Sequence, residues 1–159
     1  MWFGDNVTLA SWDDIFNSEG YAAWTQWGYA ERAGGPAANA ALNATFDRYR
    51  ERDEFWRITM IDPTRQHLFD TVYERGPMAL QALRNVIGDD AFFRLSRDWA
   101  QDPGSRSVEE WMIRAQTVTP IDLGPFSQAW IYAETAPARS VATSGTSARN
   151  VIAAGCVVT

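Results

Sequence analysis

The chain has 159 residues, of which 46 % are apolar and eight are tryptophan, so a packed domain is expected rather than a disordered segment. Its formal net charge of −6 argues against a nucleic-acid partner, because phosphate recognition needs clustered basic residues. The sequence shows neither a signal-peptide pattern nor an apolar run long enough to span a membrane, and the compartment, cytoplasmic or secreted, stays open. The single cysteine, Cys156, can form no internal disulfide.

Apolar residues at helical spacing predict a first helix from about Trp12 to Ala33, which Gly34-Gly35-Pro36 ends. The residues expected on its inward face are Trp12, Ile15, Phe16, Gly20 and Ala23. Glu19 falls on the same face, three residues after Phe16. A carboxylate is costly to bury unless it is paired, hydrogen-bonded or bound to a metal, so Glu19 either reaches water at the edge of the stripe or has a partner.

Three more helices are expected at about 39–56, 70–87 and 90–102. The residues expected to face inward on them are Leu42, Phe46, Tyr49 and Trp56, then Leu80, Leu83 and Ile87, then Phe92, Leu95 and Trp99. No convincing period-2 strand is found.

Ser107 followed by Glu110 fits a capping box, which predicts the start of a fifth helix. A sixth is expected after Asp122, with Phe126 and Trp130 on its apolar stripe. From Pro137 the chain is rich in Ala, Ser, Thr and Gly and predicts a disordered tail. The sequence therefore predicts an all-α body of about six helices at 1–136 and a tail at 137–159.

Two segments carry a resemblance to a known family. "WFGDNVTLASWDDIFNSEGYA", which ends at Ala22, resembles the active-site segment of the zinc aminopeptidases of the membrane alanyl aminopeptidase family, which are gluzincin metallopeptidases. Their segment contains Trp-Phe-Gly-Asp/Asn, then x-Val-Thr, and later a Glu-Gly-Phe-Ala block, after an upstream His-Glu-x-x-His. "VYERGPMALQALRNVIGDDAFFRLSRDWAQD", from Val72 to Asp102, resembles the family's Tyr-x-Lys/Arg-Gly segment and the helix pair after it. The resemblance covers about Met1 to Glu134.

The resemblance implies that the body is a helical part of a gluzincin, thermolysin-like, catalytic domain with peptide substrates and a Zn²⁺ cofactor. It implies that Glu19 is a zinc ligand and that Tyr73 donates a hydrogen bond to the oxyanion of the transition state. A catalytic zinc takes three protein ligands and a water, lowers the pKa of that water and polarises the scissile carbonyl. Asp14 is a candidate for orienting Glu19, and equally for a helix-start acid that interacts with the helix dipole.

The sequence also departs from the family's pattern. Asn17-Ser18 stands where the family has Leu-Asn, and Pro77 follows Gly76 and predicts that the helix starts or kinks there. The only histidine, His67, lies in an expected loop and is interpreted as an ordinary surface or packed imidazole. His-Glu-x-x-His and the family's Gly-x-Met-Glu-Asn segment do not occur in the sequence. In the family's register the second zinc-binding histidine would immediately precede Met1, which predicts that the chain is the downstream part of a longer reading frame.

These departures lead to three further expectations. The chain alone is expected to be inactive and to bind zinc weakly, because two zinc ligands and the general base are missing. The face around Glu19 is expected to expose aromatic surface, which favours marginal stability and self-association. The alternative reading is a non-catalytic helical scaffold or protein-interaction module, and a third is an unrelated all-α protein with a chance match.

Overall fold

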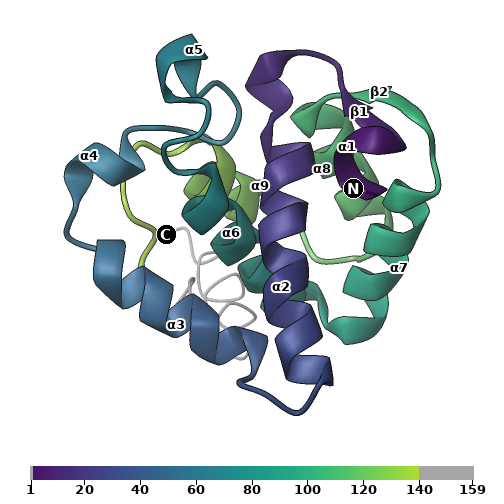
Figure 1. Cartoon of the computed structure of the whole chain (residues 1–159), viewed down its shortest axis with the longest axis horizontal. Coiled ribbons are helices and arrows are strands. Elements are labelled where there is room, and N and C mark those ends of the chain that lie inside the picture. Colours follow the sequence, from purple (N-terminus) through teal and green to yellow (C-terminus); the bar gives the residue numbers. More distant parts are fainter. Residues whose placement is uncertain (1, 140–159) are drawn as a thin grey trace, which may run out of the picture.

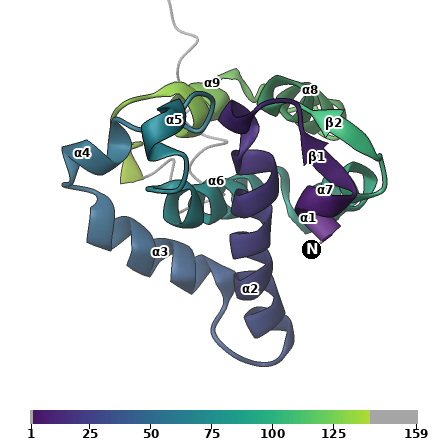
Figure 2. The ribbon, with the colours of Figure 1, turned by 45° about the horizontal axis from the view of Figure 1, so that its top comes forward.

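Two helices, α2 (Tyr21–Arg32) and α6 (Val72–Ile87), lie against each other in the middle of the molecule in the computed structural model, which describes residues 2–139 (Figure 1). Helices α3 (Ala38–Tyr49) and α7 (Asp89–Ala100) lie on opposite sides of this pair (Figure 2). The other α-helices are α1 (Trp2–Asp5), α4 (Asp53–Trp56), α5 (Thr64–His67), α8 (Val108–Thr117) and α9 (Gly124–Ser127).

The prediction of an all-α body is confirmed at the level of fold class, with one small sheet added. Strand β1 (Val7–Leu9) pairs in parallel with β2 (Gly104–Arg106), and Val7 lies opposite Gly104. Three-residue strands are too short for a period-2 pattern to stand out, which is why the sequence did not predict them. The sheet connects the start of the described chain to the segment between α7 and α8.

The segment predicted as one helix at 12–33 is helical, but it contains three types of helical geometry. It consists of the 3₁₀ turn η1 (Trp12–Asp14), the π-helix η2 (Phe16–Gly20) and α2. The prediction that Trp12 faces inward is wrong, because its side chain is 65 % exposed. The tighter and wider turns rotate the face that a regular 3.6-residue repeat would present.

Of the predicted helices, the second is interrupted and the third is continuous. The helix predicted at 39–56 is broken between α3 and α4, although Leu42, Phe46 and Trp56 are buried as expected. Helix α6, Val72–Ile87, agrees closely with the helix predicted at 70–87, and it runs through Pro77. Of the two outcomes predicted for Pro77, a start or a kink, the start is therefore wrong.

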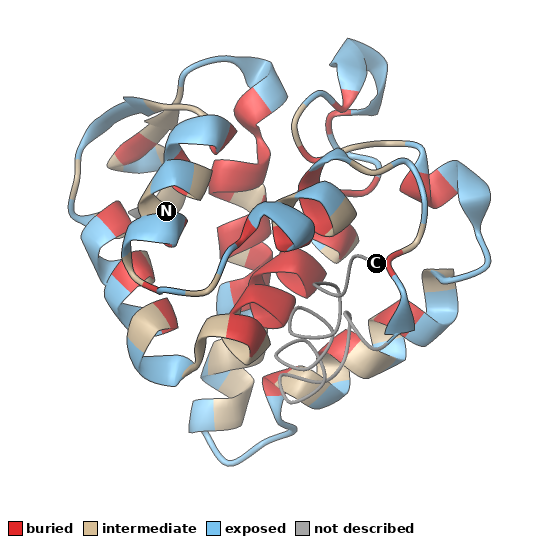
Figure 3. Ribbon diagram, turned by 180° about the vertical axis from the view of Figure 1, so that it is seen from behind, coloured by how far each residue is buried: buried red, intermediate tan, exposed pale blue. Residues whose placement is uncertain are grey.

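Buried residues concentrate in the helices at the centre of the molecule (Figure 3). Aromatic side chains fill much of this core: Phe16, Tyr21, Trp24, Phe46, Phe55, Trp56, Phe92, Trp99, Trp111, Phe126 and Trp130. Tyr21 stacks on Phe3 with 4.4 Å between the ring centroids, and its hydroxyl accepts a hydrogen bond from Nε1 of Trp111 at 2.9 Å.

Tyr21 makes the fold sensitive to alkaline pH. Burial raises the pKa of its hydroxyl to about 12, from an ordinary value near 10. The folded state holds this proton more tightly than the unfolded state. The contribution of Tyr21 to the free energy of unfolding is therefore fully present below about pH 10 and is lost as the pH rises towards about 12. We expect the free energy of unfolding to drop by roughly 2 to 3 kcal/mol across that window in urea titrations. Tyr21→Phe should flatten the drop, and an unchanged slope would contradict the assignment.

The predicted tail begins inside the described part of the chain. Pro137 is buried, and the Arg139 guanidinium forms an ion pair with Asp47 of α3 at 2.7 Å. Residues 140–159 lie outside the described residues, so the disorder predicted for them stays a prediction. Across residues 2–139, the helices are all too short or too polar to span a bilayer.

Candidate functional site

Glu19 lies in the π-helix η2, two residues before the start of α2, and is partly exposed. Its neighbours Ser18 and Gly20 are buried, so the carboxylate sits at the edge of the apolar face. Asn17, one of the two residues that differ from the family's pattern, is fully buried, and its Nδ2 donates a hydrogen bond to the carbonyl of Arg106 at 3.4 Å. π-helical turns occur frequently at functional sites.

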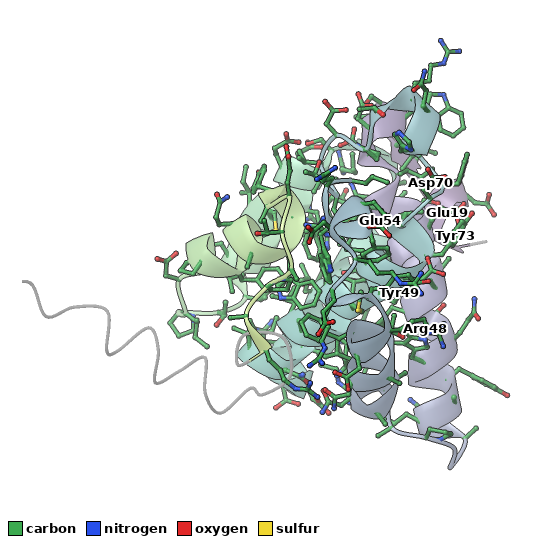
Figure 4. The ribbon with its side chains drawn as sticks, turned by 90° about the vertical axis from the view of Figure 1, so that its left-hand side faces the viewer. Glu19, Arg48, Tyr49, Glu54, Asp70 and Tyr73 are labelled. Carbon is green, nitrogen blue, oxygen red and sulfur yellow. The ribbon has the colours of Figure 1, made fainter. Side chains whose placement is uncertain are left out.

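Tyr73 lies in the first turn of α6 and carries its ring 43 % exposed, stacked at 6.4 Å on Phe69. The Glu19 and Tyr73 side chains lie next to each other on one face of the molecule (Figure 4). Desolvation raises the pKa of the Tyr73 hydroxyl, and the negative charge of Glu19 and its action as a hydrogen-bond acceptor raise it further. The two residues for which the sequence predicts functional roles are therefore brought together, although 54 positions separate them in the chain.

Two glycines beside these residues are in backbone contact. Gly20 follows Glu19, and Gly76 lies one turn after Tyr73 on the other helix. A Cβ atom placed on Gly76 would lie 2.7 Å from the Cα of Gly20, so the two backbones touch without an intervening side chain.

Arg75 anchors the same turn of α6 on the side of the core. Its fully buried guanidinium donates hydrogen bonds of 2.7 to 3.2 Å to four backbone carbonyls, those of Trp56, Ile58, Trp130 and Ala133. It also lies 5.2 Å from the Trp56 ring centroid. Burial lowers the pKa of Arg75 to about 10, which leaves the side chain charged at neutral pH. Arg75 thus ties α6 to the segment after α4 and to the π-helix η3 (Gln128–Tyr132).

Sequence reasoning did not assign a role to Arg75, although a signal was present. Arg75 precedes the buried Ala79 by four residues and the buried Ala82 by seven, so it lies on the apolar stripe of α6. A charged residue on an apolar stripe is the same signal that makes Glu19 a candidate.

Asp14 makes structural contacts at the start of two helices. Its Oδ2 accepts from the backbone N–H of Ser11 at 2.9 Å, and its Oδ1 accepts from Val108, the first residue of α8, at 2.8 Å. These contacts favour the helix-start role considered for Asp14. Its role in orienting Glu19 stays a prediction.

Removing the Asp14 carboxylate should destabilise the fold. We expect Asp14→Ala to lower the free energy of unfolding by about 2 to 3 kcal/mol, because two backbone N–H groups lose their acceptor. Urea titration followed by tryptophan fluorescence measures the loss. Asp13→Ala at the exposed neighbour is the control and should change stability by less than about 0.5 kcal/mol. Equal effects of the two variants would contradict the capping role.

Other polar side chains lie on the face that carries Glu19 and Tyr73 (Figure 4). Asp70 lies in the turn before α6 and pairs with Nδ1 of His67 at 2.6 Å. His67 is an exposed surface imidazole, but it ends α5 instead of lying in the predicted loop. Glu54 comes from α4 and Arg48 from the end of α3. These residues come from separate segments with no shared motif, so the sequence carried no signal that they meet.

The described residues do not provide a complete zinc site. The resemblance implies three protein ligands, and Glu19 is the one of them that it predicts in this chain. Within residues 2–139, no group of three or more His, Cys, Asp or Glu side chains converges in a way that could hold a metal ion. Zinc therefore does not fit the described residues by themselves.

Comparisons with known proteins agree with the geometry. The chain is 25 % identical over 104 residues to "Probable M1 family aminopeptidase 1" of Encephalitozoon cuniculi, an alignment covering 58 % of this chain and 12 % of that protein. It is 23 % identical over 138 residues to "Aminopeptidase N" of Haemonchus contortus, covering 79 % and 14 %. The chain thus spans only a small part of the length of these curated relatives.

Solved structures show the same fold. An M1 zinc metallopeptidase mutant from Deinococcus radiodurans, bound to a Tyr-Ser-Ala substrate, superposes with a TM-score of 0.78 at 26 % identity, covering 91 % of this chain and 32 % of that one. The structure of the M1 zinc metallopeptidase from the same organism gives 0.77 at 28 % identity, covering 86 % and 31 %. The profile of the peptidase family M1 domain matches residues 1–112. Because the family model matches most of the chain and the fold and the relatives agree with it, the chain belongs to peptidase family M1, the zinc aminopeptidase family of the gluzincins.

Proposed function

We propose that this chain is part of the catalytic domain of an M1 zinc aminopeptidase, in which Glu19 is a zinc ligand and Tyr73 stabilises the oxyanion during hydrolysis of N-terminal peptide bonds. The observation that carries the proposal is the juxtaposition of Glu19 with Tyr73, each in the motif that the family resemblance assigns to it. The M1 relatives, two of them named aminopeptidases, supply the substrate class.

The Tyr73 hydroxyl has the protonation state that this role needs. Its pKa is raised above the ordinary tyrosine value, so the hydroxyl keeps its proton at neutral pH. A protonated phenol at the surface of a site can donate a hydrogen bond to negative charge that develops on a carbonyl oxygen. The Phe69 ring stacks on the Tyr73 ring, and the Tyr73 hydroxyl has Glu19 as its hydrogen-bond acceptor.

We further propose that the chain alone is inactive and does not hold zinc tightly. One histidine in the whole sequence cannot supply the two imidazole ligands that the family uses with its glutamate. The pure chain should contain much less than one zinc per molecule by mass spectrometry and should not hydrolyse an aminoacyl-anilide. Zinc-dependent turnover at an enzyme-like rate would contradict this part of the proposal.

A chimera tests the proposed roles directly. Residues 1–134 of this chain replace the matching segment of the Deinococcus radiodurans M1 zinc metallopeptidase. We expect about one zinc per molecule, and we expect Glu19→Gln to weaken zinc binding by at least about tenfold. Glu109→Gln, at an exposed acid of α8, is the matched control and should leave zinc content unchanged. A folded chimera whose zinc binding does not depend on Glu19 would contradict the ligand role.

The alternative is a helical scaffold or interaction module without catalysis. Its specific support is the Asn17-Ser18 departure, where the buried Oδ1 of Asn17 has no hydrogen-bond partner among the described residues. A scaffold would fold cooperatively alone and would give a chimera that folds but does not depend on Glu19 for metal.

Self-association of the isolated chain is a related expectation. Trp12, Phe69 and Tyr73 are exposed, and Trp12 and Phe69 line one surface hollow together with Leu68. We expect concentration-dependent dimers in sedimentation equilibrium, weakened by Trp12→Ser combined with Phe69→Ser. Tyr29→Ser, at an exposed aromatic near the far end of α2, should have no effect. A monomer at all concentrations would contradict the expectation.

A further inference from the structure

The glycines at positions 20 and 76 are not needed for the backbone conformation. Gly20 has φ −60° and ψ −47°, and Gly76 lies inside α6 and is not among the glycines with positive φ. Any residue can adopt these helical angles, and glycine inside a helix costs up to about 1 kcal/mol relative to alanine. Close approach of the two backbones therefore explains both glycines.

The contact leaves no room for a methyl group on Gly76. A Cβ on Gly76 would lie 2.7 Å from the Cα of Gly20, whereas a Cβ on Gly20 would lie 3.4 Å from the Cα of Gly76 and 3.0 Å from the ring of Phe16. The atoms in conflict at Gly76 belong to backbone, so no side-chain rotation can relieve the overlap. A methyl group at Gly76 must push α6 and η2 apart.

Arg75 restrains the helix from the other side. Its four hydrogen bonds to backbone carbonyls hold this turn of α6 against two other segments. The position of the turn is thus set by the glycine contact on one face and by Arg75 on the other. Tyr73 lies on this turn, and Glu19 is the residue adjacent to Gly20.

We propose that Gly20 and Gly76 are positioning residues, whose backbone contact, held in place by Arg75, sets the separation between the carboxylate of Glu19 and the hydroxyl of Tyr73. The catalytic meaning of this spacing rests on the proposed function. The spacing itself is a property of the chain and can be tested without catalysis.

The first test uses the chain itself. In nuclear Overhauser spectra, contacts between the Tyr73 ring protons and the Glu19 side chain should be present in the unchanged chain and at least about threefold weaker in Gly76→Ala. Gly28→Ala is the matched control, because the three atoms nearest to its Cβ would be ring atoms of Trp24, at 3.2 Å or more, and none belongs to Gly76. Unchanged contacts in a folded Gly76→Ala chain would overturn the inference.

Gly20→Ala keeps the test decisive if Gly76→Ala does not fold. Its Cβ would lie at ordinary contact distance, 3.4 Å, from the Cα of Gly76 and tightly, 3.0 Å, against the ring of Phe16, so we expect a weaker loss of the same contacts. An effect in Gly28→Ala equal to that in Gly20→Ala would also overturn the inference, because it would show a general response to added methyl groups.

The second test uses the chimera and separates positioning from packing. We expect Gly76→Ala to lower kcat by about 10- to 100-fold with KM changed by less than about threefold, because misplacing Tyr73 affects the transition state more than the bound substrate. Gly28→Ala should leave both constants unchanged. A chimera inactive before any substitution counts against the proposed function and leaves the spacing result from the chain intact. Unchanged kcat in a folded, active Gly76→Ala chimera would overturn the positioning role.

Discussion

Arg75→Met is expected to lower the free energy of unfolding by about 3 to 5 kcal/mol, the largest loss we expect from any single side chain outside the aromatic core. The guanidinium supplies donors to four backbone carbonyls, and methionine supplies none. Each carbonyl left buried without a donor costs roughly 1 to 3 kcal/mol, partly offset by the charge that no longer has to be buried. Since domains are typically stable by about 5 to 15 kcal/mol, the variant should lie near the limit of folding.

Urea titration at pH 7 measures this effect, followed by circular dichroism and by tryptophan fluorescence. Arg97→Met is the matched control, because Arg97 is exposed on α7 and its guanidinium, unlike its backbone carbonyl, forms no hydrogen bond or ion pair with another described residue. It should change stability by less than about 0.5 kcal/mol. An Arg75→Met midpoint within error of the control would show that water or neighbouring donors satisfy the four carbonyls.

Local signals in the sequence predicted those parts of the fold that depend on neighbouring residues. The capping box of Ser107 and Glu110 is present as predicted, since its two hydrogen bonds form within one helical turn. The buried stripes of α7 and of the last helix also follow from spacing alone. These predictions required no knowledge of what the helices pack against.

The errors arise where distant segments decide the structure. Trp12 was assigned to the inward face by spacing, but the change from 3₁₀ to π geometry turns it outward. The two short strands pair across 97 positions, and neither half is recognisable alone. For the candidate site, the two motifs predict Glu19 and Tyr73, whereas the glycine contact and the hydrogen bonds of Arg75 depend on tertiary packing.

Tyr73→Phe should have the largest effect on activity. In an active chimera we expect kcat to fall by about 10²- to 10³-fold with little change in KM, because the lost hydrogen bond acts mainly on charge that develops in the transition state. Phenylalanine keeps the ring and its stacking on Phe69, so the fold should not change. Tyr29→Phe, which removes an exposed hydroxyl from α2, is the control and should leave kcat unchanged. A Tyr73→Phe enzyme with normal kcat would exclude Tyr73 as the oxyanion donor.

The titration of Tyr73 gives the same residue a second, independent test in the chain itself. Because desolvation and then the charge of Glu19 raise its pKa, Glu19→Gln should move this pKa down towards the ordinary tyrosine value without reaching it, since the desolvation remains. Tyrosinate absorbance in the alkaline range, with the Tyr73→Phe curve subtracted, isolates the single hydroxyl. Identical curves with and without the Glu19 charge would mean that the carboxylate and the phenol do not interact. The kinetic loss would then have to be explained without the geometry on which the proposed site depends.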